Sequence, residues 1–214
     1  MCRCVIIFIL AAASLCSQIQ AQEKDSCIKS PDVMPPKKRI RINSIRMLLD
    51  NFHAVESGKI YRSRQIPASR LARYIQKLHI KSIINLRGKN EHTRWWQQEK
   101  MVAEKHGVKL YNIPMTARCL SKRRELVRLL YLYHHAPRPI LIHCQSGSDR
   151  TGEAAALWKL CQQKKSKREA LTHLSIKYGH LRPLRPAKYF FISQWGGTKW
   201  LCSRYNHTNY PQFN

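Results

Sequence analysis

Acidic residues are scarce in this chain of 214 residues: 12 Asp and Glu stand against 39 Lys and Arg, which leaves a formal net charge of +27. The basic residues are spread along the sequence, with clusters at 37–39, 122–124 and 164–168. Such an excess favours anionic partners, including peripheral contact with anionic membranes. One binding pocket needs far fewer charges, so we interpret most of the excess as a solvated basic surface.

Other absences exclude whole classes of protein. No C-x-x-C pair occurs, so a zinc site is not expected. No motif for RNA or DNA binding is present, and the aromatic residues do not alternate with the basic runs as stacking platforms would, so no specific nucleic-acid partner is predicted. No internal repeat is visible, and the length suits one domain with appendages, which we expect to be monomeric.

Long apolar runs are missing beyond the N-terminus. Residues 1–21 combine Arg3, an apolar stretch at 5–15 and a polar segment that ends at Ala21, the pattern of a secretory signal peptide cut after Ala21. The apolar stretch is short for a membrane span. We therefore expect a secreted or periplasmic protein that is soluble once processed; an uncleaved N-terminal anchor is the alternative.

The rest of the sequence divides into a lead-in and one domain. Residues 22–50 are polar, basic and interrupted by prolines, which is typical of a linker, and the domain is expected over 51–214. Within it, short apolar runs alternate with helical patterns, an order typical of α/β folds. We expect strands at 60–62, 82–86, 108–113 and 140–143, and helices at 68–79, 95–106, 121–136 (capped by Ser121), 151–164, from 166 to near Gly179, and from near 186. The sequence thus predicts a small, mainly parallel central sheet of about four strands, flanked by helices.

The segment 143–152, His-Cys-Gln-Ser-Gly-Ser-Asp-Arg-Thr-Gly, follows the last expected strand and precedes a run of helix formers from Glu153. A loop of small residues in that position turns backbone N–H groups inward, and the helix N-terminus adds the positive end of its dipole. This field favours the thiolate form of Cys144. Arg150 adds a planar fork that can grip two phosphate oxygens. We interpret the segment as an anion cradle with a nucleophile at its base.

This segment resembles the signature loop of the cysteine-dependent protein tyrosine and dual-specificity phosphatases, in which Cys is followed by five residues, Arg and Thr-Gly, with His before the Cys. We call residues 143–152 the signature loop. The similarity extends to 60–67 and 80–87, which resemble the first strands of compact bacterial dual-specificity-type phosphatases. The resemblance implies hydrolysis of phosphate monoesters through a cysteinyl-phosphate, with no metal or other cofactor.

The same resemblance implies roles for the residues of the signature loop. Cys144 is the nucleophile, and Thr151 is expected to hydrogen-bond near its sulfur. His143 is expected to brace the loop through its ring nitrogens. Phosphate oxygens are held by the guanidinium of Arg150 and by the backbone of Gln145, Ser146, Gly147, Ser148 and Asp149.

The general acid is where the sequence departs from the family pattern. Most members carry an Asp on a loop upstream of the Cys, but the matching residues 115–121 contain no carboxylate. Asp149 is our candidate, as in the myotubularin pattern. Alternatively, its carboxylate caps the following helix or pairs with Arg150. Glu91 is the remaining candidate.

Two further features near the expected pocket have competing interpretations. Cys119 lies in the 115–121 loop, where it can form a reversible disulfide with Cys144; we expect instead that it is unpaired or paired elsewhere. Arg182 and Arg185 can approach the pocket, but we expect them at the surface.

Phosphotyrosine or phosphoprotein is the substrate class that we favour. Phosphoinositides or inositol phosphates are the alternative, because Arg118 and the cluster 122–124 suit polyanions, although the variable positions of the signature loop lack Lys and Arg. A hypothesis of another class is a catalytically inactive module that keeps the cradle and only binds phosphorylated partners.

Overall fold

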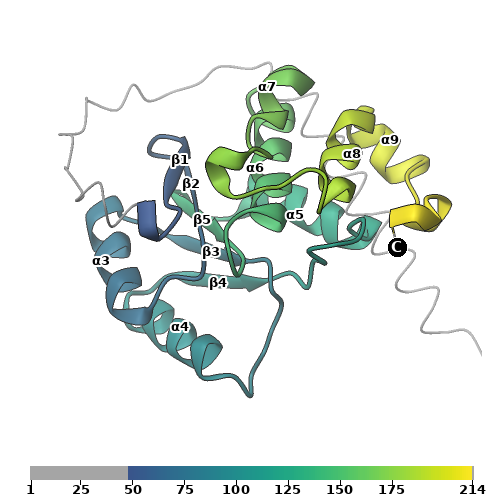
Figure 1. Ribbon diagram of the computed structural model, residues 1–214. Helices are drawn as coiled ribbons and strands as arrows, with labels where there is room; N and C mark the ends of the chain where they lie inside the picture. The colour runs from purple at the N-terminus through teal and green to yellow at the C-terminus, as the bar shows by residue number, and fades with distance from the viewer. Residues whose placement is uncertain (1–47, 214) are drawn as a thin grey trace, which may run out of the picture.

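The strand that leads to Cys144 lies in the middle of a five-stranded sheet (Figure 1). The computed structural model describes residues 48–213, and the strand order is β1-β2-β5-β3-β4. β1 pairs with β2 in antiparallel fashion, and all other pairs are parallel. The strand bounds are His53–Glu56 (β1), Ile60–Ser63 (β2), Ser82–Asn85 (β3), Lys109–Asn112 (β4) and Ile140–His143 (β5). The predicted α/β class and mainly parallel sheet are confirmed, with five strands instead of the expected four.

The additional strand, β1, lies at the edge of the sheet. It is not evident in the sequence because only Ala54 and Val55 are apolar in this short run, which shows no alternating pattern. A tight reversal at Gly58, whose φ of +77° suits glycine, turns the chain back into β2. The tertiary pairing with β2 therefore decides the conformation of β1.

Side chains alternate along β5 and so divide the interior into two cores. Ile140 and Ile142 belong to the larger core, which includes Leu126 and Leu157. Leu141 belongs to the smaller core on the opposite face. All of β5 is buried, as expected for a central parallel strand with helices on both faces.

The helices form a layer on each face of this sheet (Figure 1). α3 and α4 cover the face of the smaller core, and α5 to α9 lie on the other side. The α-helix bounds are Ala68–Leu78 (α3), Arg94–Lys105 (α4), Arg123–His135 (α5), Asp149–Cys161 (α6), Lys167–Leu171 (α7), Pro186–Gln194 (α8) and Gly197–Ser203 (α9); short 3-10 helices cover Ile176–Tyr178, His207–Asn209 and Pro211–Phe213. α6 starts inside the signature loop, so the last strand, the loop and this helix are continuous.

Two expected helix boundaries need correction. Ser121 is not the N-cap of α5, because Lys122 takes that position and Ser121 is buried. Ser166 does cap α7, since its Oγ accepts the N–H of Glu169 at 3.2 Å, but the helix ends at Leu171. Gly179, with φ of +78°, instead ends the 3-10 helix that follows. α9 was not expected from the sequence.

The expected signal peptide and most of the lead-in lie outside the described residues. Asp50, the last residue of that lead-in, is fully buried and accepts hydrogen bonds from Arg70 Nη2 at 2.8 Å and from the Tyr74 hydroxyl at 3.1 Å. Between residues 48 and 213, no helix combines the length and the apolar character that crossing a membrane requires.

Candidate active site

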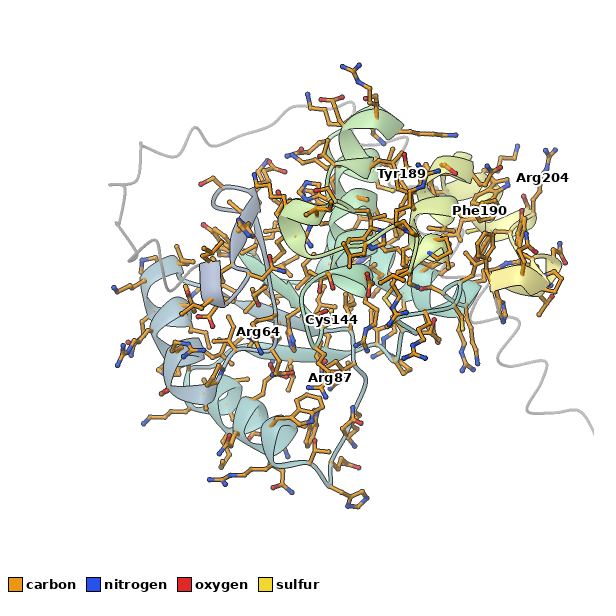
Figure 2. All side chains as sticks on the ribbon, in the orientation of Figure 1. Arg64, Arg87, Cys144, Tyr189, Phe190 and Arg204 are labelled. Carbon is orange, nitrogen blue, oxygen red and sulfur yellow. The ribbon has the colours of Figure 1, made fainter. Side chains whose placement is uncertain are left out.

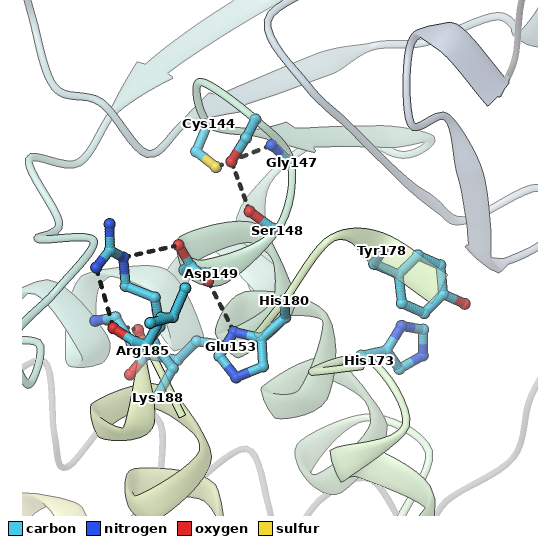
Figure 3. A network of polar contacts seen from close by, with 12 residues as sticks. Cys144, Gly147, Ser148, Asp149, Glu153, His173, Tyr178, His180, Arg185 and Lys188 are labelled. Carbon is cyan, nitrogen blue, oxygen red and sulfur yellow. Dashed lines mark hydrogen bonds and ion pairs between the residues drawn. The ribbon is translucent and has the colours of Figure 1, made fainter. Parts of the chain in front are cut away.

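Cys144 lies at the base of the signature loop, directly after β5, and is 1% exposed. The backbone N–H of Gly147 donates a hydrogen bond to its Sγ at 3.3 Å (Figure 3). α6 begins at Asp149, so the positive end of its dipole lies at the same loop. Both features stabilise negative charge on the sulfur, which is the form of cysteine that attacks phosphorus.

The carbonyl oxygens of the loop are bound by groups outside it. The donors are Gln65 N to Gln145 O at 3.1 Å, Asn51 Nδ2 to Ser146 O at 3.1 Å, and Arg62 Nη2 to Gly147 O at 2.6 Å. Because a peptide C=O and the N–H that follows it point in opposite directions, the next three N–H groups face the inside of the loop. These N–H groups form a nest suited to an anion.

Gly147 is the residue whose backbone makes this loop possible. Its φ is +78°, a conformation that L side chains rarely adopt. A Cβ at this position would lie 2.7 Å from the backbone N of Arg64 and 2.8 Å from the carbonyl carbon of Ser63. Glycine is therefore required for two reasons, the backbone angle and the close approach of β2.

Two guanidinium groups lie near the thiol. Arg150, in the first turn of α6, donates from Nη1 to Leu86 O at 3.5 Å. Arg87 packs its guanidinium carbon 3.6 Å from the ring centre of Trp95. Burial lowers the pKa of Arg87, the charge of Arg150 lowers it further and that of Cys144 opposes this, so the three groups lie within electrostatic range. Figure 2 shows Arg87 near Cys144, whereas Tyr189, Phe190 and Arg204 lie toward α8 and α9.

The carboxylate of Asp149 points toward His180 and Arg185 (Figure 3). Its Oδ1 lies 2.7 Å from His180 Nδ1, and its Oδ2 lies 3.9 Å from Arg185 Nε. Its hydrogen-bond partner is therefore His180, rather than Arg150 or a backbone N–H of the helix. Arg185 approaches the signature loop instead of lying only at the surface, which corrects our expectation for this residue.

The whole arrangement matches a known family. Residues 45–163 fit the model of the tyrosine phosphatase family. The chain belongs to this family.

Solved structures of phosphatases share the fold. The core catalytic domain of the PP-IP phosphatase SIW14 from S. cerevisiae, in complex with citrate, is 25% identical, with a TM-score of 0.57 over 77% of this chain and 88% of that one. TpbA from P. aeruginosa, in complex with phosphotyrosine, is 20% identical, with a TM-score of 0.54 over 72% of this chain and 90% of that one. A putative phosphatase from Shewanella putrefaciens is 15% identical, with a TM-score of 0.56 over 78% of this chain and all of that one.

Arg62 is a part of this phosphatase site that the sequence analysis missed. Its side chain is fully buried, and besides Gly147 O it binds His173 O at 2.9 Å and lies 3.9 Å from the ring centre of Tyr178. Burial lowers the pKa of Arg62 to about 10. Burial, aided by the charge of Arg62, lowers the pKa of His173 to about 3, so this ring is neutral at ordinary pH. An arginine inside an otherwise apolar strand was the available signal.

Glu99 of α4 is a second part that the sequence analysis missed. Its Oε1 lies 2.9 Å from His143 Nε2, and both side chains are almost wholly buried. Gln65 Nε2 donates to the same oxygen at 3.1 Å. The other ring nitrogen of His143 lies 3.4 Å from Cys144 O. The carboxylate therefore fixes the ring that precedes the nucleophile; a buried acid on the apolar face of an expected helix was the signal.

Three sequence candidates do not make the contacts that we considered for them. The hydroxyl of Thr151 is buried without a hydrogen-bond partner among the described residues, so the expected bond to the Cys144 sulfur is not formed. Cys119 and Cys144 are both free thiols, so the disulfide between them is not formed. Glu91 is exposed and pairs with Lys89 at 2.7 Å, and this hydrogen bond lowers the pKa of Glu91.

No group of three or more His, Cys, Asp or Glu side chains within residues 48–213 is placed to hold a metal ion. The groups gathered around Cys144 are backbone amides, two guanidinium groups and a helix N-terminus. All of them bind anions directly.

Proposed function

We propose that this protein hydrolyses phosphate monoesters through a cysteinyl-phosphate on Cys144. The observation that carries the proposal is the Gly147 N–H directed at Cys144 Sγ, inside a loop whose carbonyls are bound from outside. The thiolate attacks phosphorus, the S–P bond forms, and the bond to the leaving oxygen breaks. Arg150 and the backbone N–H groups of 145–149 hold the non-bridging oxygens while charge develops on them. Water then cleaves the S–P bond, releasing phosphate and restoring the thiolate.

Asp149 is the general acid in this proposal, and His180 is its partner. A proton shared between Asp149 Oδ1 and His180 Nδ1 passes to the leaving oxygen in the first step, and the attacking water returns a proton to the pair in the second. A bound dianion favours the protonated carboxyl by like-charge repulsion, whereas Arg185 opposes this effect. Glu91 is the weaker candidate, because its ion pair with Lys89 favours the charged carboxylate.

Phosphotyrosine in proteins is the substrate class that we favour, and the TpbA structure with phosphotyrosine shows that this fold accommodates that group. An inositol phosphate is the second candidate, favoured by the additional guanidinium of Arg87 beside Arg150 and by the similarity to SIW14, described as a PP-IP phosphatase. The two candidates differ in charge density, since an inositol phosphate presents several phosphate groups to the same basic pocket.

We also propose that the catalytic domain occupies residues 51–214 and acts outside the cytosol, as a secreted or periplasmic protein. Cys202 takes part in a disulfide, which supports an oxidising compartment. The sequence of residues 1–21, with its signal-peptide pattern, supports the same location.

The test is phosphate release by the wild-type protein, Cys144→Ser and Asp149→Asn. We expect Cys144→Ser to lose activity on every substrate, because serine is not ionised at neutral pH. Asp149→Asn should retain much of its turnover of an aryl phosphate with a good leaving group, which needs little acid help, but lose about 10²-fold or more on a phosphotyrosine peptide. Phosphopeptides and inositol phosphates assayed side by side decide the substrate class. A folded wild-type protein that binds phosphopeptides without turning over any substrate would establish the inactive binding module instead.

A further inference from the structure

The segment between α7 and α8 exposes apolar and basic side chains side by side. Residues 176–185, Ile-Lys-Tyr-Gly-His-Leu-Arg-Pro-Leu-Arg, contain no acidic residue, and we call them the 176–185 loop. Ile176 is 79% exposed, Leu181 44% and Leu184 65%. Each of these apolar residues is followed directly by a basic one, namely Lys177, Arg182 and Arg185.

Such exposure is concentrated in this loop. Six large apolar side chains stand out as exposed in the described part of the chain, and three of them fall within these ten residues. The others are Leu48, Leu49 and Met101, which lie outside the loop. Apolar side chains gathered at a surface mark a place where another molecule or a membrane binds.

The loop is fixed against the signature loop by side chains that point inward. His180 binds Asp149 at 2.7 Å. Asn51 Nδ2 donates both to Tyr178 O at 3.0 Å and to Ser146 O at 3.1 Å, and thereby joins the two loops. A surface that binds the 176–185 loop therefore also lies next to the entrance above Cys144.

We propose that the 176–185 loop docks this protein onto an anionic lipid membrane. Ile176, Leu181 and Leu184 enter the boundary between headgroups and acyl chains, and the basic residues between them remain at the level of the lipid phosphates. The guanidinium of Arg182 lies 4.0 Å from the ring centre of Tyr189, which holds this charge at the surface. A protein groove fits less well, because a cation adjoins every apolar side chain and the whole chain carries a net charge of +27. This proposal goes beyond the phosphatase reaction and does not depend on it.

Docking has a consequence for the choice of substrate. With the 176–185 loop in the membrane surface, the pocket above Cys144 is presented to phosphate groups attached to lipids or to membrane proteins. Phosphorylated groups close to the lipid surface are then met at a higher local concentration than groups free in solution.

The test is co-sedimentation of the purified full chain with vesicles. Vesicles of phosphatidylcholine with about one-third phosphatidylserine should bind the wild-type protein at least about tenfold more tightly than vesicles of phosphatidylcholine alone. The triple variant Ile176→Ser, Leu181→Ser, Leu184→Ser should lose about tenfold or more of this binding. The matched control Leu48→Ser, Leu49→Ser, Met101→Ser removes three apolar side chains that are equally exposed, and it should bind as the wild type does. Circular dichroism and turnover of a soluble aryl phosphate show that both variants remain folded.

Three results would overturn the proposal. Unchanged vesicle binding by the 176–185 variant would mean that the attraction comes from diffuse charge, and an equal loss in both triple variants would mean the same. Failure of the wild-type protein to bind phosphatidylserine vesicles rejects membrane docking, also when the loop proves to bind a protein instead. Vesicle binding is measured without turnover, so failure of the phosphatase proposal leaves this test intact.

Discussion

The two ends of the signature loop are held by different parts of the molecule. The Cys144 end is fixed by nearly buried side chains from the sheet and from α4, namely Arg62, His143 and Glu99. The Asp149 end is held by His180, which lies 31 residues further along the chain, and by the partly exposed Arg185. The end that binds the anion is thus part of the core, and the end that we assign to proton transfer rests on a surface loop. Proton transfer can therefore be altered through that loop without disturbing the cradle.

The largest effect in this comparison is expected where α8 is fastened to the signature helix. Lys188 Nζ lies 2.9 Å from Glu153 Oε2 and donates to Ser121 Oγ at 2.6 Å, with the Lys188 and Glu153 side chains fully buried. Lys188→Met leaves the carboxylate of Glu153 buried without a counter-charge, so we expect a loss of about 3–5 kcal/mol in the free energy of unfolding, measured in urea.

The control for this variant is a pair of the same type at the surface. Lys165 pairs with Glu169 at 3.4 Å, and both side chains are about half exposed. Lys165→Met should therefore change the free energy of unfolding by no more than about 0.5 kcal/mol. Equal effects of the two variants would show that the buried pair does not fasten α8 to α6.

The Cys144 end is tested by Gly147→Ala. The added methyl group meets the backbone of β2 at 2.7 Å, so the loop must shift and the N–H of Gly147 turns away from the sulfur. We expect kcat/KM for an aryl phosphate to fall about 100-fold, because one preorganised donor contributes this much in comparable anion-binding sites.

Gly58→Ala is the matched control, because Gly58 has nearly the same φ of +77° but nothing within 4 Å of the added Cβ. It introduces similar backbone strain, about 1 kcal/mol, without touching the signature loop. Its activity should stay within about twofold of the wild type once folding is verified. A comparable loss of activity in both variants would show that strain, rather than the position of the loop, explains the result.

The smallest effect is expected at the Asp149 end. His180→Asn removes the ring that shares a proton with Asp149, so kcat/KM for a phosphotyrosine peptide should fall about tenfold, and turnover of an aryl phosphate with a good leaving group should fall less than about twofold. The basic limb of the pH–rate profile should change with the peptide substrate only.

A double variant distinguishes positioning from a purely structural role. His180→Asn combined with Asp149→Asn should lose no more activity than Asp149→Asn alone, because the two residues act as one unit. His135→Asn, at an exposed position at the end of α5, is the control and should leave both substrates unaffected. Additive losses in the double variant would contradict the proton-sharing role of His180.

The candidate nucleophile and its loop could be found in the sequence because they are local. Strand, loop and helix follow one another without interruption from Ile140 to Cys161, so the spacing alone places Cys144 and Arg150 at one site. The same holds for most helices and for four of the five strands, whose apolar patterns span a few consecutive residues.

The partners of these residues could not be found in this way. Arg62 and His173 are 111 residues apart, and Asn51 and Tyr178 are 127 residues apart. Polar residues such as Arg62 and Glu99 are ordinarily placed at the surface, and only a folded arrangement shows that each meets a buried partner.

The amino-acid sequence by itself determined the α/β class, the signature loop and the thiol chemistry, because these depend on residues that are neighbours along the chain. Only the tertiary structure decided which groups hold the loop open, which base meets Asp149 and which apolar side chains stay in water. The physical reason is that burial and pairing of charge depend on segments brought together from distant parts of the chain, and local patterns of hydrophobicity carry no information about that choice.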